Sequence, residues 1–480
     1  MNWLIFWILI YLVALIYLTL KHVKHRDPEY YLVNNRSTRT LPLVFTTLAT
    51  FVGGGTSIGL IAMGYESGFA AVGIGIAYVT GFMIMLRYAG KIRDYGKKNR
   101  IYTFPQYLIG RLAGGSSQLF RRLFSTTING VNIFIFFFLL AAQFVGMATL
   151  LKHGFSIGYQ TAVIISALII IFYTAFAGLS GVIYTDMLQF IVIVIMMVVI
   201  FIPGIILDTD GFSRLSELPS TMINGLHYGP VFLIGLLLFL SPSVLVRMDI
   251  WQRMLAAKDA ATAKKASFWS GIGMLPFYII FPLVGMSVRI TMSGDLDPNE
   301  TAFLFIDKHS GAFIYAFALT GLLAALMSSG DSFLNIISIS AVQDFAGWRK
   351  KVLVNAEKSQ YYIRIVTVIF GVIALFVALV FPYIVDLMVV GIGTIVIFVP
   401  ITLLALNNEN PGKYASAALW SILAGFVVNT VFFAWGVISP QAFEPKSSFI
   451  PAFIISAIVL LIGMKFTSKT KELSNADPIQ

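Results

Sequence analysis

Long apolar stretches recur along the whole chain, and they decide what kind of fold it can adopt. A helix needs about 20 apolar residues to cross the hydrocarbon core of a bilayer, which is about 30 Å thick. The sequence therefore predicts an all-α integral membrane protein, with residues 1–480 forming a single membrane domain. About thirteen stretches have roughly the required length, at residues 2–20, 41–63, 70–90, 124–151, 157–178, 181–206, 229–246, 266–290, 311–343, 361–381, 384–406, 414–437 and 449–466.

Charged residues are too few to build a water-facing surface. They make up 11% of the chain, and hydrophobic residues make up 58%, whereas roughly a quarter of a soluble domain is charged. The net charge of +11 would indicate a nucleic-acid partner only if a folded soluble domain carried a basic face. No stretch between the apolar segments is long enough for such a domain. We expect a multi-pass protein of the inner or plasma membrane, with the lipid bilayer around it and no obligatory protein partner.

The basic residues indicate which helix ends face the cytoplasm. If the N-terminus lies outside, most of the 33 Lys and Arg residues fall in cytoplasmic segments, as the positive-inside rule requires. Arg247 and Arg253 belong to one of these segments. An odd number of spans then puts the C-terminus inside. The first apolar stretch has its basic residues behind it, so we expect an uncleaved anchor rather than a signal peptide.

Two apolar stretches carry residues that interrupt a helix near the middle of the span. A helix that faces lipid cannot be interrupted there, because its free backbone groups would have no hydrogen-bond partners. The second contains three adjacent glycines at 53–55, and the seventh contains Pro242 after Ser241. Small residues also allow close helix packing, but three adjacent glycines favour an unwound segment, and Pro removes a backbone donor. Breaks at matching positions of two five-helix blocks are typical of secondary transporters with inverted repeats. The predicted division is an extra helix and cytoplasmic loop at 1–40, repeat one at 41–206, repeat two at 229–406, and two extra helices with a tail at 407–480.

Polar side chains within the spans point to an ion site. Asp186 and Asp331 lie where a charge is costly and therefore indicates function. Sodium prefers oxygen ligands, which the hydroxyls of Ser328 and Ser329 and the free carbonyls of an unwound helix would supply. Serine pairs in membrane helices also serve packing or bond to their own helix, so the residues alone leave both explanations open.

Four separated blocks closely resemble the sodium/solute symporter family, which contains sodium-coupled sugar, proline, pantothenate and sialic acid transporters. The resemblance extends from about residue 40 to residue 345. It implies a LeuT-type fold of two five-helix inverted repeats, with one extra helix before them and two after. The blocks are ATFVG at 49–53, GLSGVIYTDMLQ at 178–189, WQRMLAAK at 251–258 and ALMSSGDSFLN at 325–335.

The resemblance also implies a sodium site. By motif position, its ligands would be the backbone carbonyls of Ala49, Val52 and Ala325 and the hydroxyls of Ser328 and Ser329. Sodium would be the coupling ion, and neither another metal nor an organic cofactor is expected.

A second cation site, used by only some members, would involve Asp186, Ser328 and Ser332. Asp331 stands where one branch of the family has a serine. The candidates for this second site are therefore Asp186, Asp331 and Ser332, and the site would hold sodium differently, bind a proton or be absent.

The resemblance excludes few of the candidate solutes. Sialic acid transporters carry an Arg in the helix that corresponds to residues 124–151, which has none, and proline transporters carry Asp where Phe51 stands. Neither solute is a direct match, and we expect a small polar organic molecule. Polar residues that could face its cavity can equally well form hydrogen bonds between helices. These candidates are Gly53, Thr56, Ser57, Asn132, Gln143 and Ser241.

These features predict a sodium-coupled symporter that imports its solute by alternating access. A membrane enzyme is disfavoured because the chain has no Cys and its 5 His residues lie at span ends or in loops. A primary pump is disfavoured because the sequence lacks a GxxxxGK[ST] phosphate loop. The alternatives are a proton-coupled symporter of the same fold and a non-concentrative channel or sensor. Uptake of solute against its own concentration gradient would distinguish a symporter from a channel or a sensor.

Overall fold

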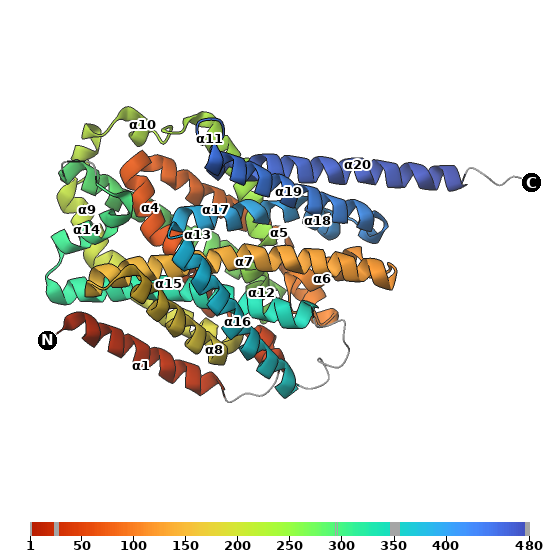
Figure 1. Cartoon of the computed structure of the whole chain (residues 1–480), viewed down its shortest axis with the longest axis horizontal. Coiled ribbons are helices and arrows are strands. Elements are labelled where there is room, and N and C mark those ends of the chain that lie inside the picture. The colour runs from red at the N-terminus through yellow and green to blue at the C-terminus, as the bar shows by residue number, and fades with distance from the viewer. Residues whose placement is uncertain (1, 24–27, 293, 295, 346–355, 476–480) are drawn as a thin grey trace, which may run out of the picture.

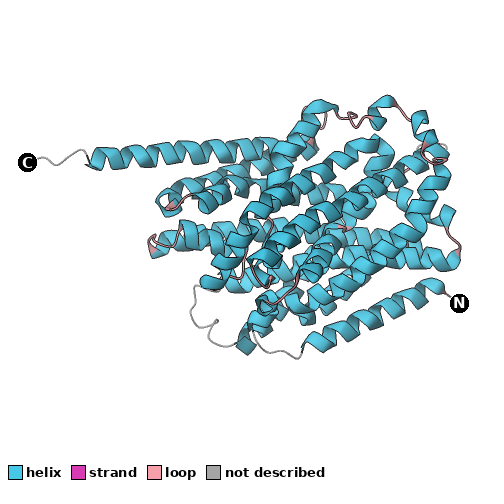
Figure 2. Ribbon diagram, turned by 180° about the vertical axis from the view of Figure 1, so that it is seen from behind, coloured by secondary structure: helices cyan, strands magenta, loops and turns pink. Residues whose placement is uncertain are grey.

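The computed structural model describes residues 2–23, 28–292, 294, 296–345 and 356–475. Every predicted apolar stretch is helical within these ranges, and the helices run side by side in one bundle (Figures 1 and 2). The N- and C-termini lie at opposite ends of this bundle. The helices are α1 Trp3–Val23, α2 Pro28–Val33, α3 Thr40–Phe51, α4 Gly54–Ser67, α5 Val72–Lys98, α6 Phe104–Leu112, α7 Gln118–Phe155, α8 Tyr159–Met196, α9 Ile202–Asp208, α10 Ser220–Ile223, α11 Gly229–Gly235, α12 Met248–Ala256, α13 Ala260–Thr291, α14 Thr301–His309, α15 Ala312–Ile339, α16 Ala356–Val380, α17 Ile384–Ile395, α18 Val399–Asn407, α19 Ala415–Ile438 and α20 Phe449–Asn475.

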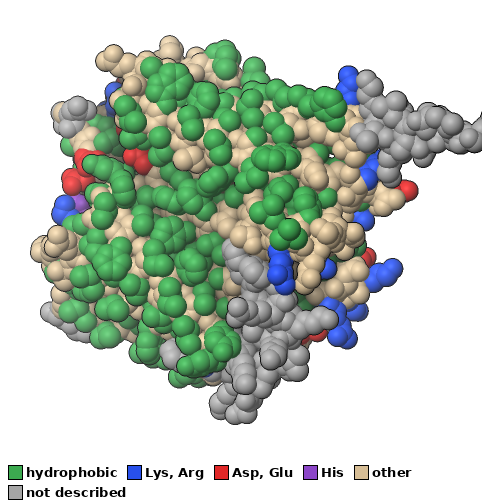
Figure 3. Space-filling model, turned by 45° about the vertical axis from the view of Figure 1, so that its right-hand side comes forward, with side chains coloured by type: hydrophobic (Ala, Val, Ile, Leu, Met, Phe, Trp, Pro, Cys, Tyr) green, Lys and Arg blue, Asp and Glu red, His purple; other side chains and the backbone are tan. Residues whose placement is uncertain are grey.

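The outer surface of the bundle suits a bilayer. Among the described residues, eleven helices are long and apolar enough to cross a membrane, and Thr40–Phe51 and Tyr159–Ala175 are shorter apolar helices. Figure 3 shows a broad apolar face, with Lys and Arg side chains gathered toward one end of it and acidic side chains toward the other. Lipid tails offer no partners for polar groups, so this distribution is the one that a membrane requires. The chain is a multi-pass membrane protein.

α8 contains a sharp bend, although its backbone is helical throughout Tyr159–Met196. The hydroxyl of Tyr173 lies 2.5 Å from that of Thr185. A straight helix would separate two residues at this spacing by about 18 Å along its axis, which exceeds the reach of both side chains. The chain must therefore turn back between Tyr173 and Thr185, where the sequence predicted the division between two spans.

The predicted break in the second apolar stretch is confirmed. α3 ends at Phe51, Gly53 is extended with φ −67° and ψ −168°, and α4 begins at Gly54. The break is tightly packed, because a β-carbon on Gly53 would lie 2.1 Å from the Ser329 hydroxyl oxygen. No side chain fits at this position without displacing α15.

The second interruption extends over a longer segment than predicted. After α11, the chain forms a π-helical turn at Leu236–Leu240 and a 3₁₀ turn at Ser241–Val246. Pro242 fits the first turn of this 3₁₀ segment, because the N–H that Pro lacks needs no partner there. The backbone becomes extended only at Arg247, with φ −74° and ψ 122°, before α12 begins. The predicted interruption at Ser241 and Pro242 therefore lies within the segment that departs from α-helix, and the extended residue follows it at Arg247.

α15 lies at the centre of the arrangement that holds the site. It packs along α7 and α8 and also contacts α3 and α4 on either side of the first break. All its residues from Ala318 to Ile339 are buried. Polar side chains on α15 therefore meet other protein groups rather than lipid.

Candidate functional site

The first break and α15 are joined by a hydroxyl group. Ser329 Oγ donates a hydrogen bond to the carbonyl of Thr50 at 2.7 Å and lies 3.4 Å from the carbonyl of Ala325. Carbonyls in the last turn of a helix lack intrahelical partners, and the end of α3 leaves such groups beside α15. Ala49 and Val52 are fully buried at this end. The structure thus gathers oxygen atoms of the kind that sodium prefers.

Ser328 faces a different partner from its neighbour. Its hydroxyl donates to Asp186 Oδ1 at 2.5 Å, and the hydroxyl of Thr46 donates to the other oxygen of the same carboxylate. Consecutive residues on a helix point about 100° apart, so two adjacent serines cannot both face one point equally. Ser328 belongs to the Asp186 cluster in this structure, whereas Ser329 belongs to the break.

Arg253 lies at the centre of the Asp186 cluster. Its Nη2 atom lies 3.4 Å from Asp186 Oδ2 and donates to the hydroxyls of Thr46, Thr50 and Ser332 at 3.1, 2.5 and 3.2 Å. The arginine is 1% exposed and the aspartate is 0% exposed. The positive charge of Arg253 therefore lies next to Asp186 and Ser332, two of the residues that the sequence predicted for a second cation site.

Asp331 is separated from this network. It is fully buried, and within the described part of the chain neither of its carboxylate oxygens has a hydrogen-bond partner. The hydroxyl of Tyr173 and the N–H of Ser332 are its polar neighbours, and the charges of both Asp186 and Arg253 act on it. Burying an uncompensated charge is costly, so this carboxyl group requires either a proton or a cation.

Arg247 and Arg253 are buried, which their sequence did not predict. The sequence put both in a cytoplasmic segment, but they are 5% and 1% exposed. Every residue of α12 is buried, so these arginines meet protein groups rather than water. The signal that could have revealed them is their place next to that interruption, where irregular backbone lines a cavity.

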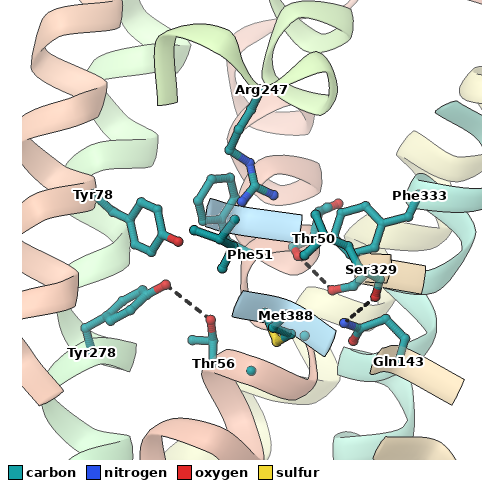
Figure 4. A pocket seen from close by; sticks show the side chains of 14 residues that line it. Thr50, Phe51, Thr56, Tyr78, Gln143, Arg247, Tyr278, Ser329, Phe333 and Met388 are labelled. Atoms are coloured by element: carbon teal, nitrogen blue, oxygen red, sulfur yellow. Dashed lines mark hydrogen bonds between the residues drawn. The ribbon is translucent and has the colours of Figure 1, made fainter. Parts of the chain in front are cut away.

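A small cavity of about 30 Å³ lies beside the first break (Figure 4). That volume holds about one water molecule, so the cavity would have to widen to admit an organic solute. Gly53, Thr56 and Gln143, which the sequence predicted, line it. Ser329, predicted as a sodium ligand, lines it as well. The remaining lining residues were not predicted as site residues, and they are Thr50, Phe51, Gly55, Tyr78, Leu139, Arg247, Tyr278, Phe333, Met388 and Ile392.

Three predicted cavity residues lie elsewhere. Ser57 donates to the carbonyl of Gly53 at 3.0 Å, within its own helix. Asn132 donates to Ser340 at 3.1 Å, which is a contact between helices. Ser241 is fully buried outside the cavity lining, and its hydroxyl has no partner among the described residues.

Comparison with known proteins identifies related transporters. The model of the sodium:solute symporter family matches residues 30–425. A sodium/proline symporter of Staphylococcus aureus is 27% identical over 472 residues, covering 92% of this chain and 87% of the relative.

Solved structures show the same fold. A Na⁺-coupled sialic acid symporter in a substrate-bound outward-open state aligns with a TM-score of 0.74 and 18% identity, covering 94% of this chain and 95% of that one. Mhp1, a nucleobase-cation-symport-1 family transporter in a closed conformation, aligns with a TM-score of 0.55 and 14% identity, covering 92% and 95%. These neighbours have the LeuT-type fold that the sequence predicted.

Proposed function

Because the chain belongs to the sodium:solute symporter family, we propose that it imports a small polar organic solute together with sodium by alternating access. The family and the fold are those of a transporter rather than an enzyme, located in the plasma membrane. The observation that carries the proposal is the contact between Ser329 and the broken end of α3. An ion at this contact would join the two repeats and so couple its own binding to their movement.

The proposed sodium ligands are the carbonyls of Ala49, Val52 and Ala325 and the hydroxyls of Ser328 and Ser329. Ser329 already lies within hydrogen-bond distance of carbonyls from both helices. Ser328 would have to turn from Asp186 toward the ion, which links the occupancy of the sodium site to the Asp186 cluster.

We propose that one sodium ion suffices for each cycle. The guanidinium of Arg253 already compensates Asp186, so Asp186 and Ser332 would not need a second ion. A sodium ion that falls through 100 mV gains about 2.3 kcal/mol, and a tenfold gradient adds about 1.4 kcal/mol. Together these drive a several-hundred-fold accumulation of a neutral solute. A solute with one negative charge would cancel the charge of the ion, so the tenfold sodium gradient alone would drive its accumulation, by about tenfold.

The proposed topology has thirteen spans, with the N-terminus outside and the C-terminus inside. The termini at opposite ends of the bundle (Figure 1) and the bend in α8 support an odd number of spans. The proposed division is repeat one at 41–206 and repeat two at 229–406, flanked by 1–40 and 407–480. Some basic residues counted as cytoplasmic lie outside the described residues, and they are Lys24, Arg26, Arg349, Lys350 and Lys351; the acidic Asp295, counted as external, does too.

Proton coupling is the second candidate, and Asp331 favours it. A buried carboxyl group without a hydrogen-bond partner among the described residues could take up a proton on one side of the membrane and release it on the other. In that case Asp331→Asn would abolish uptake that a proton gradient drives and leave sodium-driven uptake intact.

Solute uptake into proteoliposomes tests the proposed function. Amino acids, sugars, carboxylates and vitamins are offered with an inward sodium gradient, and separately with an inward proton gradient. We expect sodium-driven accumulation that Ser329→Ala abolishes and that Thr320→Val preserves, because the Thr320 hydroxyl bonds only back to the Ala316 carbonyl of the same helix. Accumulation driven by protons alone, or unchanged in Ser329→Ala, contradicts the sodium assignment.

A further inference from the structure

The cavity beside the first break contains one charged side chain, and the proposed sodium site does not use it. Arg247 reaches this cavity from the extended residue between the 3₁₀ turn and α12. None of the described residues that line the cavity is acidic. A solute entering here therefore meets a positive charge on the wall and no negative side chain.

The guanidinium of Arg247 is held rigidly. Its Nε atom lies 3.0 Å from Asp249 Oδ1 and its Nη2 atom 2.7 Å from Oδ2. Asp249 is fully buried and does not line the cavity. The guanidinium carbon also lies 4.2 Å from the centre of the Phe51 ring. This paired geometry uses one N–H of Nε and one of Nη2, and the hydroxyl of Tyr78 is also a hydrogen-bonding neighbour of the guanidinium. A guanidinium has five N–H donors, so it can bind a ligand beside these partners with little reorganisation.

Further hydrogen-bond donors stand beside Arg247. The hydroxyls of Tyr78 and Tyr278 point into the cavity (Figure 4), and both lie close enough to the guanidinium to interact with it. Tyr278 also lies 3.2 Å from the hydroxyl of Thr56. Hydroxyl and guanidinium groups together suit a ligand group that only accepts hydrogen bonds.

The opposite wall of the cavity combines apolar side chains with the polar groups of Thr50, Gln143 and Ser329. Its apolar residues are Leu139, Phe333, Met388 and Ile392. Such side chains suit the carbon skeleton of a ligand rather than a set of hydroxyl groups. The cavity is therefore divided into a cationic, donor-rich part and a part that holds its apolar side chains.

We propose that Arg247 binds the carboxylate of the transported solute and that this solute is a small monocarboxylate with an apolar body. This inference rests on the proposed function and specifies its substrate class. An ammonium group would find no carboxylate among the lining residues, and a sugar would leave many hydroxyls against the apolar side chains. Because the pair Arg247–Asp249 is fixed before the solute arrives, the solute carboxylate gains a charge-assisted contact at low entropic cost.

The variants must distinguish solute binding by Arg247 from a structural role. The ion pair between Arg247 and Asp249 also joins the extended residue of the second interruption to the first turn of α12. Arg247→Gln alone would leave Asp249 buried without its partner, which destabilises a protein strongly. The double variant Arg247→Gln/Asp249→Asn removes both charges and keeps hydrogen-bonding groups. Arg289→Gln is the matched control, since Arg289 also lies over a tyrosine ring, Tyr65, at 5.3 Å, but does not line the cavity.

The test is ligand binding to the purified full chain in nanodiscs, followed by the thermal unfolding midpoint. The probes are lactate and phenylacetate, their amides lactamide and phenylacetamide, proline and glucose, each in sodium chloride and in potassium chloride. We expect at least one carboxylate to raise the midpoint in sodium chloride while its amide does not. The double variant should weaken this binding about 10- to 150-fold, and Arg289→Gln should leave it unchanged.

The possible results discriminate between the two proposals. The inference is overturned if an amide, glucose or proline binds better than both carboxylates, if neither carboxylate binds, or if the double variant binds carboxylate like wild type. Sodium-dependent binding of a neutral solute would overturn the inference and leave the proposed symport standing. Carboxylate binding of equal strength in potassium chloride, lost in the double variant, would support the role of Arg247 and contradict sodium coupling.

Discussion

The Nη2 atom of Arg253 lies 3.4 Å from Asp186 Oδ2 in the interior of the bundle, and the same nitrogen contacts hydroxyls from α3 and α15. Helices α3, α8 and α15 thus all contact the guanidinium that α12 carries. Breaking a buried ion pair by removing one partner leaves an uncompensated charge, which costs about 3–5 kcal/mol, whereas removing both partners costs much less.

This relationship predicts a strongly non-additive mutant cycle. Arg253→Gln and Asp186→Asn should each destabilise the protein, and the double variant should be more stable than the sum of the two losses by about 1–3 kcal/mol. Chemical unfolding of the purified variants measures the coupling. Additive losses would show that the two side chains act independently.

A second prediction concerns the space at the first break. Gly53→Ala should abolish sodium-dependent uptake, because the added carbon would lie 2.1 Å from the Ser329 hydroxyl oxygen and would push α15 away from α3. Gly130→Ala is the control, since a β-carbon there meets nothing within 4 Å. Initial uptake rates of the two variants check the prediction, and normal uptake by Gly53→Ala would refute the proposed ligand geometry.

A third prediction concerns the contacts at the end of α12 that faces the cytoplasm in the proposed topology. Arg93 on α5 donates to the carbonyls of Ala257 and Lys258 at 2.5 and 2.6 Å. These contacts tie the end of α12 to repeat one, so their loss should favour opening toward the cytoplasm. The chain has no native Cys, which makes labelling of an introduced thiol straightforward.

The measurement uses Ser125→Cys, a residue that lines a cavity of about 700 Å³. Its rate of reaction with a water-soluble maleimide should rise severalfold when Arg93→Gln is added. Arg87→Gln serves as the control, because Arg87 lies on the same helix but is exposed and stacks on the neighbouring Tyr88 ring. Equal labelling rates in the two backgrounds would show that Arg93 does not restrain the opening.

The spans and the first break could be predicted because their causes are local. Length and apolarity alone determine whether a segment can cross a bilayer. Glycine disfavours a helix because it loses much conformational freedom on folding, and the break falls at Gly53, the first of the three adjacent glycines. The membrane location and the family followed from such features together with the motif blocks.

The positions of Arg247 and Arg253 could not be predicted because they depend on tertiary structure. A basic residue near the end of an apolar stretch has the same local sequence whether it lies in a loop or folds back into the bundle. The opposite orientations of Ser328 and Ser329 also depend on how α15 is rotated against α3 and α8, and the sequence does not specify that rotation. The length of the second interruption could not be predicted either, because Pro242 is accommodated in a 3₁₀ segment that runs from Ser241 to Val246.

Equilibrium binding of radioactive sodium to the purified protein tests the central claim most directly. Wild type and Thr320→Val should bind sodium saturably with the same affinity, and Ser329→Ala should bind it at least tenfold more weakly, which corresponds to about 1.4 kcal/mol. Sodium binding by Ser329→Ala that matches wild type would contradict the proposal that the broken end of α3 and Ser329 form the coupling site.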